Sequence, residues 1–245
     1  MRTGLTGKII IVADGTGAIG VGIVRALLEQ GATVIVPAKR LHELNWLKDY
    51  VANLSTGKLI TLLSDMPDFD KAVDVVEGIM EEFGRIDLVV SVFDCRWSGP
   101  SLIDVEIGDW QRVMDQYVTA YFVAGRVVLN AMREHDHGMF ISIADTERMQ
   151  PKAHASLAGI ATAMQVELTK LFAENLKGSH VKLHHLFINN VVTRDKSASL
   201  IGKRGWITPE MVGEHVIRLY KGEVDEPGEM FQEFLGKPVN ANKGE

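Results

Sequence analysis

The residues with the most evident chemical use form a glycine-rich loop close to the start of the chain. Gly15, Gly17 and Gly20 stand in a G-x-G-x-x-G spacing that includes Ile19, between a short apolar run and a helical pattern. Backbone N–H groups of such a loop can face a pyrophosphate at a helix N-terminus, and glycine lets the ligand approach the backbone closely. The spacing and its context favour nucleotide binding over the alternative, a tight turn that binds nothing.

Two cations follow the second apolar run of the chain, at Lys39 and Arg40. At this position a basic residue accommodates the 2′-phosphate of an adenosine ribose, whereas Asp or Glu meets a free 2′-hydroxyl. Arg40 could hold a phosphate through two N–H groups. If a nucleotide binds, we therefore expect NADP(H) in preference to NAD(H). The competing interpretation is a pair of solvated cations at the start of a surface helix.

Seven short apolar runs alternate with longer helical patterns. The runs cover residues 8–13, 33–37, 58–63, 87–93, 139–144, 181–188 and 230–235, and the helical patterns cover 18–30, 69–83, 109–133, 155–176 and a last helix from Thr208. Most runs are rich in Val, Ile and Leu without alternation, as in strands buried on both faces of a parallel sheet. The pattern predicts one α/β domain over residues 1–245, with a doubly wound, mostly parallel sheet of about seven strands of the Rossmann type.

The composition narrows the class of protein. The 245 residues are 46% hydrophobic and 24% charged, which is typical of a globular chain. Cys95 is the only cysteine, so no intrachain disulfide can form and a reducing, cytoplasmic location is expected. We find no secretory signal pattern and no apolar stretch of the ~20 residues that span a bilayer. A net charge of −6 without a Lys/Arg stripe favours a small-molecule ligand over nucleic acid.

Further segments carry recognisable patterns. Residues 83–90 read FGRIDLVV, residues 63–66 read LSDM, and residues 109–115 read DWQRVMD, while Thr208-Pro209-Glu210 opens the last helix. In this order, together with the glycine loop, they resemble the short-chain dehydrogenase/reductase family over nearly the whole chain. The resemblance implies a Rossmann-type fold and a nicotinamide dinucleotide cofactor.

The resemblance also implies a cofactor groove and an assembly. It places Asp65 and Met66 near an adenine, and it matches Thr193 to a family threonine beyond the sixth strand. The two long helical patterns carry the small-residue faces that the family uses for dimer and tetramer contacts. A homo-oligomer is therefore expected, with a hetero-oligomer containing a paralogue as the alternative.

The chain departs from the family pattern around the cofactor groove. The Thr-Gly that begins the family's glycine loop reads Ala13-Asp14 here. The family's N-N-A-G segment reads Ser91-Val92-Phe93-Asp94, and a bulky Phe93 could cover the groove where the nicotinamide riboside would lie. These departures leave open that nucleotide binding has been lost.

The catalytic positions depart further. In the family, a tyrosine protonates the carbonyl oxygen and a lysine four residues later lowers its pKa. When the chain is aligned on 168–170, the tyrosine falls on Ala158, the lysine on Thr162, the serine on Asp145 and the asparagine on Tyr117. None of the four tyrosines, at 50, 117, 121 and 220, has a lysine four places on. The usual proton source is therefore missing from the sequence.

Other side chains could do acid–base chemistry near the vacated positions. Asp145 and His154 could form an acid–base pair, and Tyr117 or Tyr121 could donate to an oxyanion. Three hypotheses remain open. The chain is an atypical NADP(H)-dependent oxidoreductase acting on a small carbonyl or hydroxyl compound, a noncatalytic partner subunit of the same fold, or a lyase, cyclase or isomerase that uses the cleft without hydride transfer.

The remaining reactive side chains suggest structural roles. The H-x-H spacing of His135 and His137 has no third ligand pattern, so we predict a polar turn and no metal site. His184 and His185 are adjacent in a predicted strand and should point to opposite faces. Cys95 has no identifiable base beside it and is expected to be a half-buried bystander.

Overall fold

A computed structural model describes residues 4–64, 66–93, 95, 97–145, 156–189 and 207–234. These residues form a seven-stranded sheet in the order β3-β2-β1-β4-β5-β6-β7, and every neighbouring pair is parallel. The strands are β1 Ile9–Ala13, β2 Thr33–Ala38, β3 Lys58–Leu63, β4 Leu88–Ser91, β5 Met139–Asp145, β6 Lys182–Ile188 and β7 Phe231–Phe234. The predicted doubly wound α/β fold is confirmed, and its sheet is entirely parallel.

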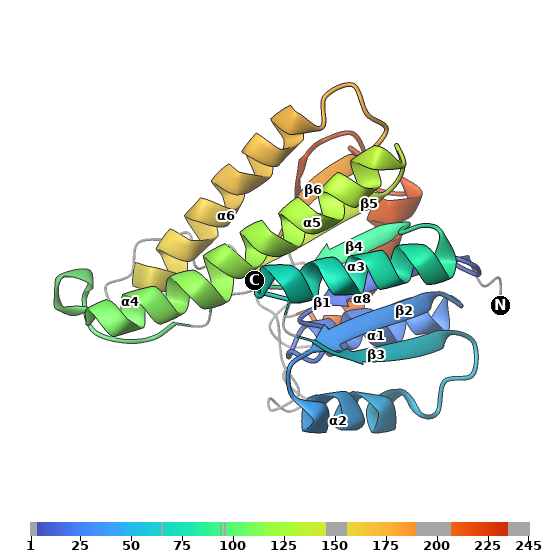
Figure 1. The fold of residues 1–245 in the computed structure, drawn as a ribbon, viewed down its shortest axis with the longest axis horizontal. Coiled ribbons are helices and arrows are strands. Elements are labelled where there is room, and N and C mark those ends of the chain that lie inside the picture. Colours follow the sequence, from blue (N-terminus) through green and yellow to red (C-terminus); the bar gives the residue numbers. More distant parts are fainter. Residues whose placement is uncertain are drawn as a thin grey trace, which may run out of the picture.

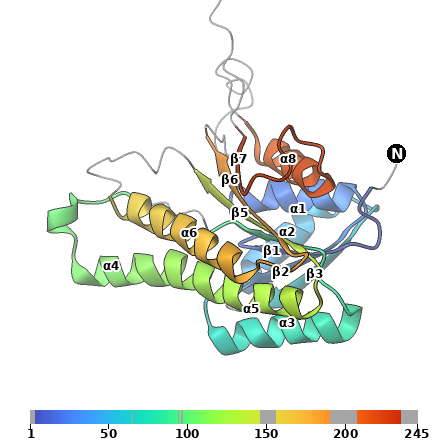
Figure 2. The same cartoon turned by 90° about the horizontal axis from the view of Figure 1, so that it is seen from above.

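Helices cover both faces of this sheet (Figures 1 and 2). They are α1 Gly20–Glu29, α2 Leu41–Val51, α3 Phe69–Phe83, α4 Ile107–Val113, α5 Ala120–Glu134, α6 Ser156–Asn175 and α8 Pro209–Lys221, together with the 3₁₀ turn η1 Leu102–Asp104 and the π-helical turn η2 Met114–Thr119. One apolar core joins α1, α2 and α8 to the sheet, and a second joins α3, α5 and α6 to its other face.

The burial of β1 shows why the apolar runs do not alternate. All five of its residues are buried. Ile10 and Val12 pack in the core beneath α1 and α8, whereas Ile9 and Ile11 pack in the core beneath α3 and α5. A strand covered on both faces needs apolar side chains at every position.

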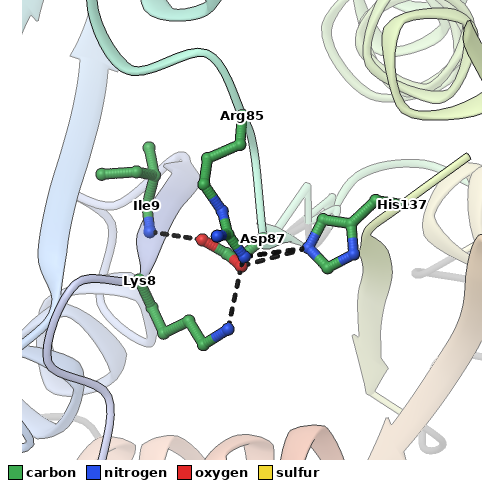
Figure 3. Close-up of polar contacts among 5 residues, drawn as sticks. All are labelled: Lys8, Ile9, Arg85, Asp87 and His137. Atoms are coloured by element: carbon green, nitrogen blue, oxygen red, sulfur yellow. Dashed lines mark hydrogen bonds and ion pairs between the residues drawn. The ribbon is translucent and has the colours of Figure 1, made fainter. Parts of the chain in front are cut away.

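Asp87 anchors the sheet at the amino ends of its central strands (Figure 3). Its side chain is fully buried, and its carboxylate accepts the amide of Ile9 at 2.9 Å and lies 3.1 Å from both Lys8 Nζ and His137 Nε2. Arg85 also forms an ion pair with it. Burial opposes the charge of Asp87, but hydrogen bonds from the Ile9 amide and from the Arg85, His137 and Lys8 side chains hold its pKa below the usual value. The FGRIDLVV segment therefore ties β1 to β4.

Candidate functional site

A cavity of about 240 Å³ lies at the carboxyl ends of the central strands. Strand order reverses between β1 and β4, and open α/β sheets bind ligands at this switch point. The cavity is lined from the glycine loop, from the ends of β2, β3 and β4, and from η2. Its lining residues are Asp14, Thr16, Pro37, Ala38, Lys39, Arg40, Glu43, Ser64, Met66, Pro67, Phe93, Gln116 and Tyr117.

The predicted glycines shape the loop beside this cavity and do not line it. A Cβ added to Gly20 would lie 2.2 Å from the Asp14 carbonyl oxygen, so only glycine allows α1 to begin this close to the loop. A Cβ on Gly15 would lie 2.9 Å from Val36 Cγ1 of β2. Ile19, which precedes α1, is buried in the core.

Asp14 places a negative charge in the glycine loop. Its φ is +59°, a left-handed conformation that the family's glycine adopts readily and that aspartate tolerates better than most residues. Its Oδ2 lies 2.7 Å from where a Cβ on Gly17 would be, and its side chain lines the cavity. A carboxylate here would repel a pyrophosphate bound beside the loop, and the Gly15 and Gly17 amides already donate to the Val12 and Asp14 carbonyl oxygens.

Two cations line the part of the cavity where β2 ends. Lys39 and Arg40 line it together with Ala38 and Met66. Arg40 forms an ion pair with Glu43, which is three residues on, but 61% of the Arg40 side chain is exposed. Exposed pairs of this kind contribute at most about 1 kcal/mol, so a ligand phosphate could displace Glu43. The charge of Lys39 and Arg40 suits this part of the cavity to an anionic group.

Two aromatic residues line the cavity on the β4 side of the switch point, across β1 from β2. Phe93 follows β4 and lines the cavity, and Tyr117 lies in η2. A π-helical turn is uncommon and is frequent at functional sites. Among the described residues, Tyr117 is the predicted proton donor that lines the cavity.

The comparison with family models decides the class of this protein. The model of the short chain dehydrogenase family matches residues 8–198. The chain belongs to the short-chain dehydrogenase/reductase family. Within the family, a short chain dehydrogenase of Pseudocercospora fijiensis is 29% identical over 178 residues, which cover 72% of this chain and 57% of that protein. The chain thus spans little more than half the length of that relative.

Other short-chain dehydrogenases match over similar or longer stretches. An NADP-dependent 3-hydroxy acid dehydrogenase of Escherichia coli O6:H1 is 25% identical over 176 residues, which cover 71% of this chain and 69% of that protein. The structure of an NAD⁺-bound xylitol dehydrogenase superimposes with a TM-score of 0.80 at 16% identity and covers 95% of this chain and 99% of that one. This structural likeness shows the shared fold.

The positions aligned with the family's tyrosine and lysine are packed inside the protein. Ala158 and Thr162 of α6 are 0% and 2% exposed. Ala158 packs with Leu157, Ala161 and Cys95 in a small apolar cluster. Cys95 is 1% exposed, so the expectation of a half-buried cysteine is wrong, because α6 and residues 113–118 cover it.

Two other acid–base candidates, Asp145 and Tyr121, are not among the described residues that line the cavity. Asp145 ends β5 and is partly buried. Tyr121 is 1% exposed, its hydroxyl lies 2.7 Å from Thr169 Oγ1, and burial raises the pKa of its phenol. Tyr121 thus belongs to the core. His154, Asp65 and Thr193 lie outside the described residues.

The histidines of the described residues lie in separate environments. His184 Nδ1 lies 2.9 Å from the Glu229 carbonyl oxygen, whereas His185 Nδ1 lies 2.6 Å from Ser142 Oγ. The prediction that they point to opposite faces is confirmed. His135 Nδ1 lies 2.9 Å from the Ala131 carbonyl oxygen, whereas His137 Nε2 lies 3.1 Å from Asp87 Oδ1. Across the described ranges, no helix is long and apolar enough to cross a membrane.

Sequence reasoning missed several residues of the site. Ser64, Gln116 and Glu43 line the cavity, and Gln165 contacts two of its segments. The spacing of Arg40 and Glu43 is a helical ion-pair signal that could have been found. Gln165 carries no such signal, because its partners are backbone carbonyls far away in the sequence.

Proposed function

We propose that this protein binds NADP(H) in the cavity and acts as an atypical oxidoreductase on a small carbonyl or hydroxyl compound. The observation that carries the proposal is the convergence of Lys39, Arg40 and Tyr117 on one cavity at the switch point of the sheet. The relatives support a nicotinamide nucleotide, since one is NADP-dependent by name and another was solved with NAD⁺. The two cations favour the 2′-phosphorylated form.

In this proposal different residues of the chain bind the cofactor, donate the proton and exclude water. Lys39 and Arg40 hold the 2′-phosphate, and the bound cofactor supplies the hydride chemistry. The Tyr117 hydroxyl donates a proton to the substrate oxygen as negative charge develops there. Phe93 limits access of water to this end of the cavity. A cytoplasmic location is part of the proposal, because the chain carries a single, buried cysteine.

The cofactor preference is tested by replacing Arg40. NADPH should raise the thermal unfolding midpoint more than NADH does at equal concentration, because a ligand that binds only the folded state stabilises it. Arg40→Ala should weaken NADPH binding by about tenfold, the usual worth of a charge-assisted hydrogen bond, and leave NADH binding nearly unchanged. Arg133→Ala, an exposed arginine of α5, is the matched control. An equal loss for both nucleotides, or no shift at millimolar NADPH, would contradict the proposal.

The proton donor is tested by removing a single oxygen atom. Tyr117→Phe should lower turnover of NADPH with a panel of small aldehydes and ketones by about 10²-fold or more, while NADPH affinity is retained. Asp145→Asn and His154→Ala test the two other acids that the sequence suggested. Full activity in Tyr117→Phe would transfer the role to one of those residues.

A noncatalytic role is the second candidate. The buried, tightly packed Ala158 and Thr162 favour it, because they leave no room at those positions for a phenol and an ammonium group. The catalytic site is then degenerate, and the chain acts as a partner subunit for an active paralogue. Tight NADPH binding without turnover of any substrate, together with co-purification of an active relative, would favour this role over the first.

An apolar groove between α5 and α6 supports self-association. Its lining includes Phe122, Met164 and Leu171, which are 41%, 42% and 53% exposed. We propose that a second copy of the chain covers this groove. The double variant Phe122→Glu/Leu171→Glu should be monomeric in light scattering, because it places charges in the buried centre of the contact. Ile103→Glu, at an exposed apolar residue in η1, should leave the molar mass in light scattering the same as that of the wild-type oligomer.

A further inference from the structure

Gln165 joins two segments of the cavity wall through its side-chain amide. Its Nε2 donates to the Phe93 carbonyl oxygen at 2.9 Å and to the Tyr117 carbonyl oxygen at 2.9 Å. Gln165 lies on α6 and is 3% exposed. A primary amide has two N–H donors, and each has one of these carbonyls as its acceptor.

The backbone around Tyr117 explains why such a donor is needed. In η2 the hydrogen bonds run from residue i to i+5, and α5 then resumes the i to i+4 pattern. At such a change of pattern a carbonyl is left without its usual partner, and a buried carbonyl without a donor is costly. The Phe93 carbonyl lies in the loop after β4, beyond the last residue of that strand. One buried amide satisfies both groups.

A simple packing role does not account for this residue. The buried positions that precede Gln165 on α6 are Leu157, Ala158, Ala161 and Thr162, and the first three belong to an apolar cluster. An apolar residue at 165 would also pack in this buried position, but it would remove the side-chain donor from two carbonyls. The polar amide is therefore matched to the two segments that it connects.

These two segments carry the aromatic side chains at one end of the cavity. Phe93 comes from the loop after β4 and Tyr117 from η2, so no shared element fixes their relative position. We propose that Gln165 is a positioning residue that locks Phe93 and Tyr117 in place, and thereby sets how the nicotinamide half of a dinucleotide is received. This role rests on the nucleotide binding proposed above.

The test compares two ligands that share their adenosine half. Gln165→Leu should weaken NADPH binding about tenfold, as expected if the aromatic pair is correctly placed only about a tenth of the time. Binding of adenosine 2′,5′-bisphosphate should change less than about twofold, because that ligand reaches only the Lys39 and Arg40 end. Gln165→Glu keeps the shape of the side chain but loses one donor or both. It should therefore weaken NADPH binding and spare the bisphosphate, as Gln165→Leu does. A parallel loss for both ligands, or an unchanged NADPH affinity, would overturn the proposal.

Gln232 offers a matched control. It is another buried glutamine whose Nε2 donates to two carbonyls, those of Glu226 and Glu229, at 2.7 and 2.8 Å. Gln232→Leu should lower thermal stability while the ratio of the two ligand affinities stays at its wild-type value. A shift of that ratio equal to the one in Gln165→Leu would show a general effect of stability and would reject the positioning role.

A measurement without ligand separates this inference from the proposed function. In Gln165→Leu, the amides of η2 should exchange hydrogen at least about tenfold faster than in the wild type, while the amides of α3 remain unchanged. Unchanged exchange in η2 would refute the locking role even if NADPH binds. Faster exchange in a protein that binds neither ligand would uphold the lock and reject the nucleotide function.

Discussion

Asp14→Asn is expected to tighten NADPH binding by about fivefold or more. At roughly 4 Å, two unit charges repel by about 1 kcal/mol in bulk water and by about 4 kcal/mol near a protein surface. Asp14 is exposed, so we expect the lower part of that range. Asparagine keeps the size of the side chain and tolerates the left-handed backbone, so the substitution removes the charge with little other change. Isothermal titration with NADPH measures the effect.

Ionic strength provides the control for this interpretation. If repulsion by the Asp14 carboxylate weakens binding, the advantage of Asp14→Asn should shrink as salt is raised from about 0.01 to 1 M, since screening lengths fall from about 30 to 3 Å. Asp14→Gly should behave in the same way, because glycine adopts the positive φ freely. An asparagine variant that binds NADPH no better than the wild type at low salt would show that the carboxylate does not face the ligand's phosphates.

The free energy of unfolding is expected to fall by about 3 kcal/mol between pH 6.5 and pH 4 through His185 alone. Burial lowers the pKa of this imidazole from the ordinary 6.5 to about 4. The unfolded chain then binds a proton at higher pH than the folded chain does. The stabilising contribution is present above pH 6.5 and is lost as the pH falls toward 4. A difference of this size corresponds to about 3 kcal/mol.

Urea unfolding at several pH values tests this expectation. His185→Gln should be less stable than the wild type at neutral pH, but its stability should decline less steeply below pH 6.5. Burial also lowers the pKa of His184 and His215, so some acid sensitivity should remain. His42→Gln, at an exposed residue of α2, should keep the full wild-type slope. If His185→Gln declined as steeply as the wild type, this histidine would not be the group that titrates.

The elements that the sequence predicted well carry strong local signals. The predicted helix at 69–83 has the bounds of α3, which Asp68 caps by accepting the Lys71 amide and which ends at Gly84 with a φ of +70°. The apolar runs give all seven strands to within a few residues, because both faces of the sheet are covered. In contrast, α2 was not among the predicted helical patterns and entered only as the surface helix in the competing interpretation of Lys39 and Arg40, since its only buried residues are Leu44, Leu47 and Val51.

The predictable part of the site is the part that follows strand ends. Lys39 and Arg40 were predicted in the groove because they follow the second strand, and Phe93 because the family resemblance places its segment there. The helix predicted at 109–133 is interrupted by η2, which local propensity does not reveal, since its carbonyl is satisfied by a residue 48 positions away. The left-handed conformation of Asp14 was not predicted either, because the only sign of it in the sequence is that the family has a glycine at that position.

The network around Asp87 has a consequence for how this fold can change over evolutionary time. The residues that secure the central strands gather at one edge of the sheet, while those that could bind or transform a small molecule gather at the opposite edge. Substitutions in the second group therefore leave the first intact. A lineage can lose an ancestral reaction, pass through inactive intermediates that still fold, and acquire a new reaction on the same scaffold.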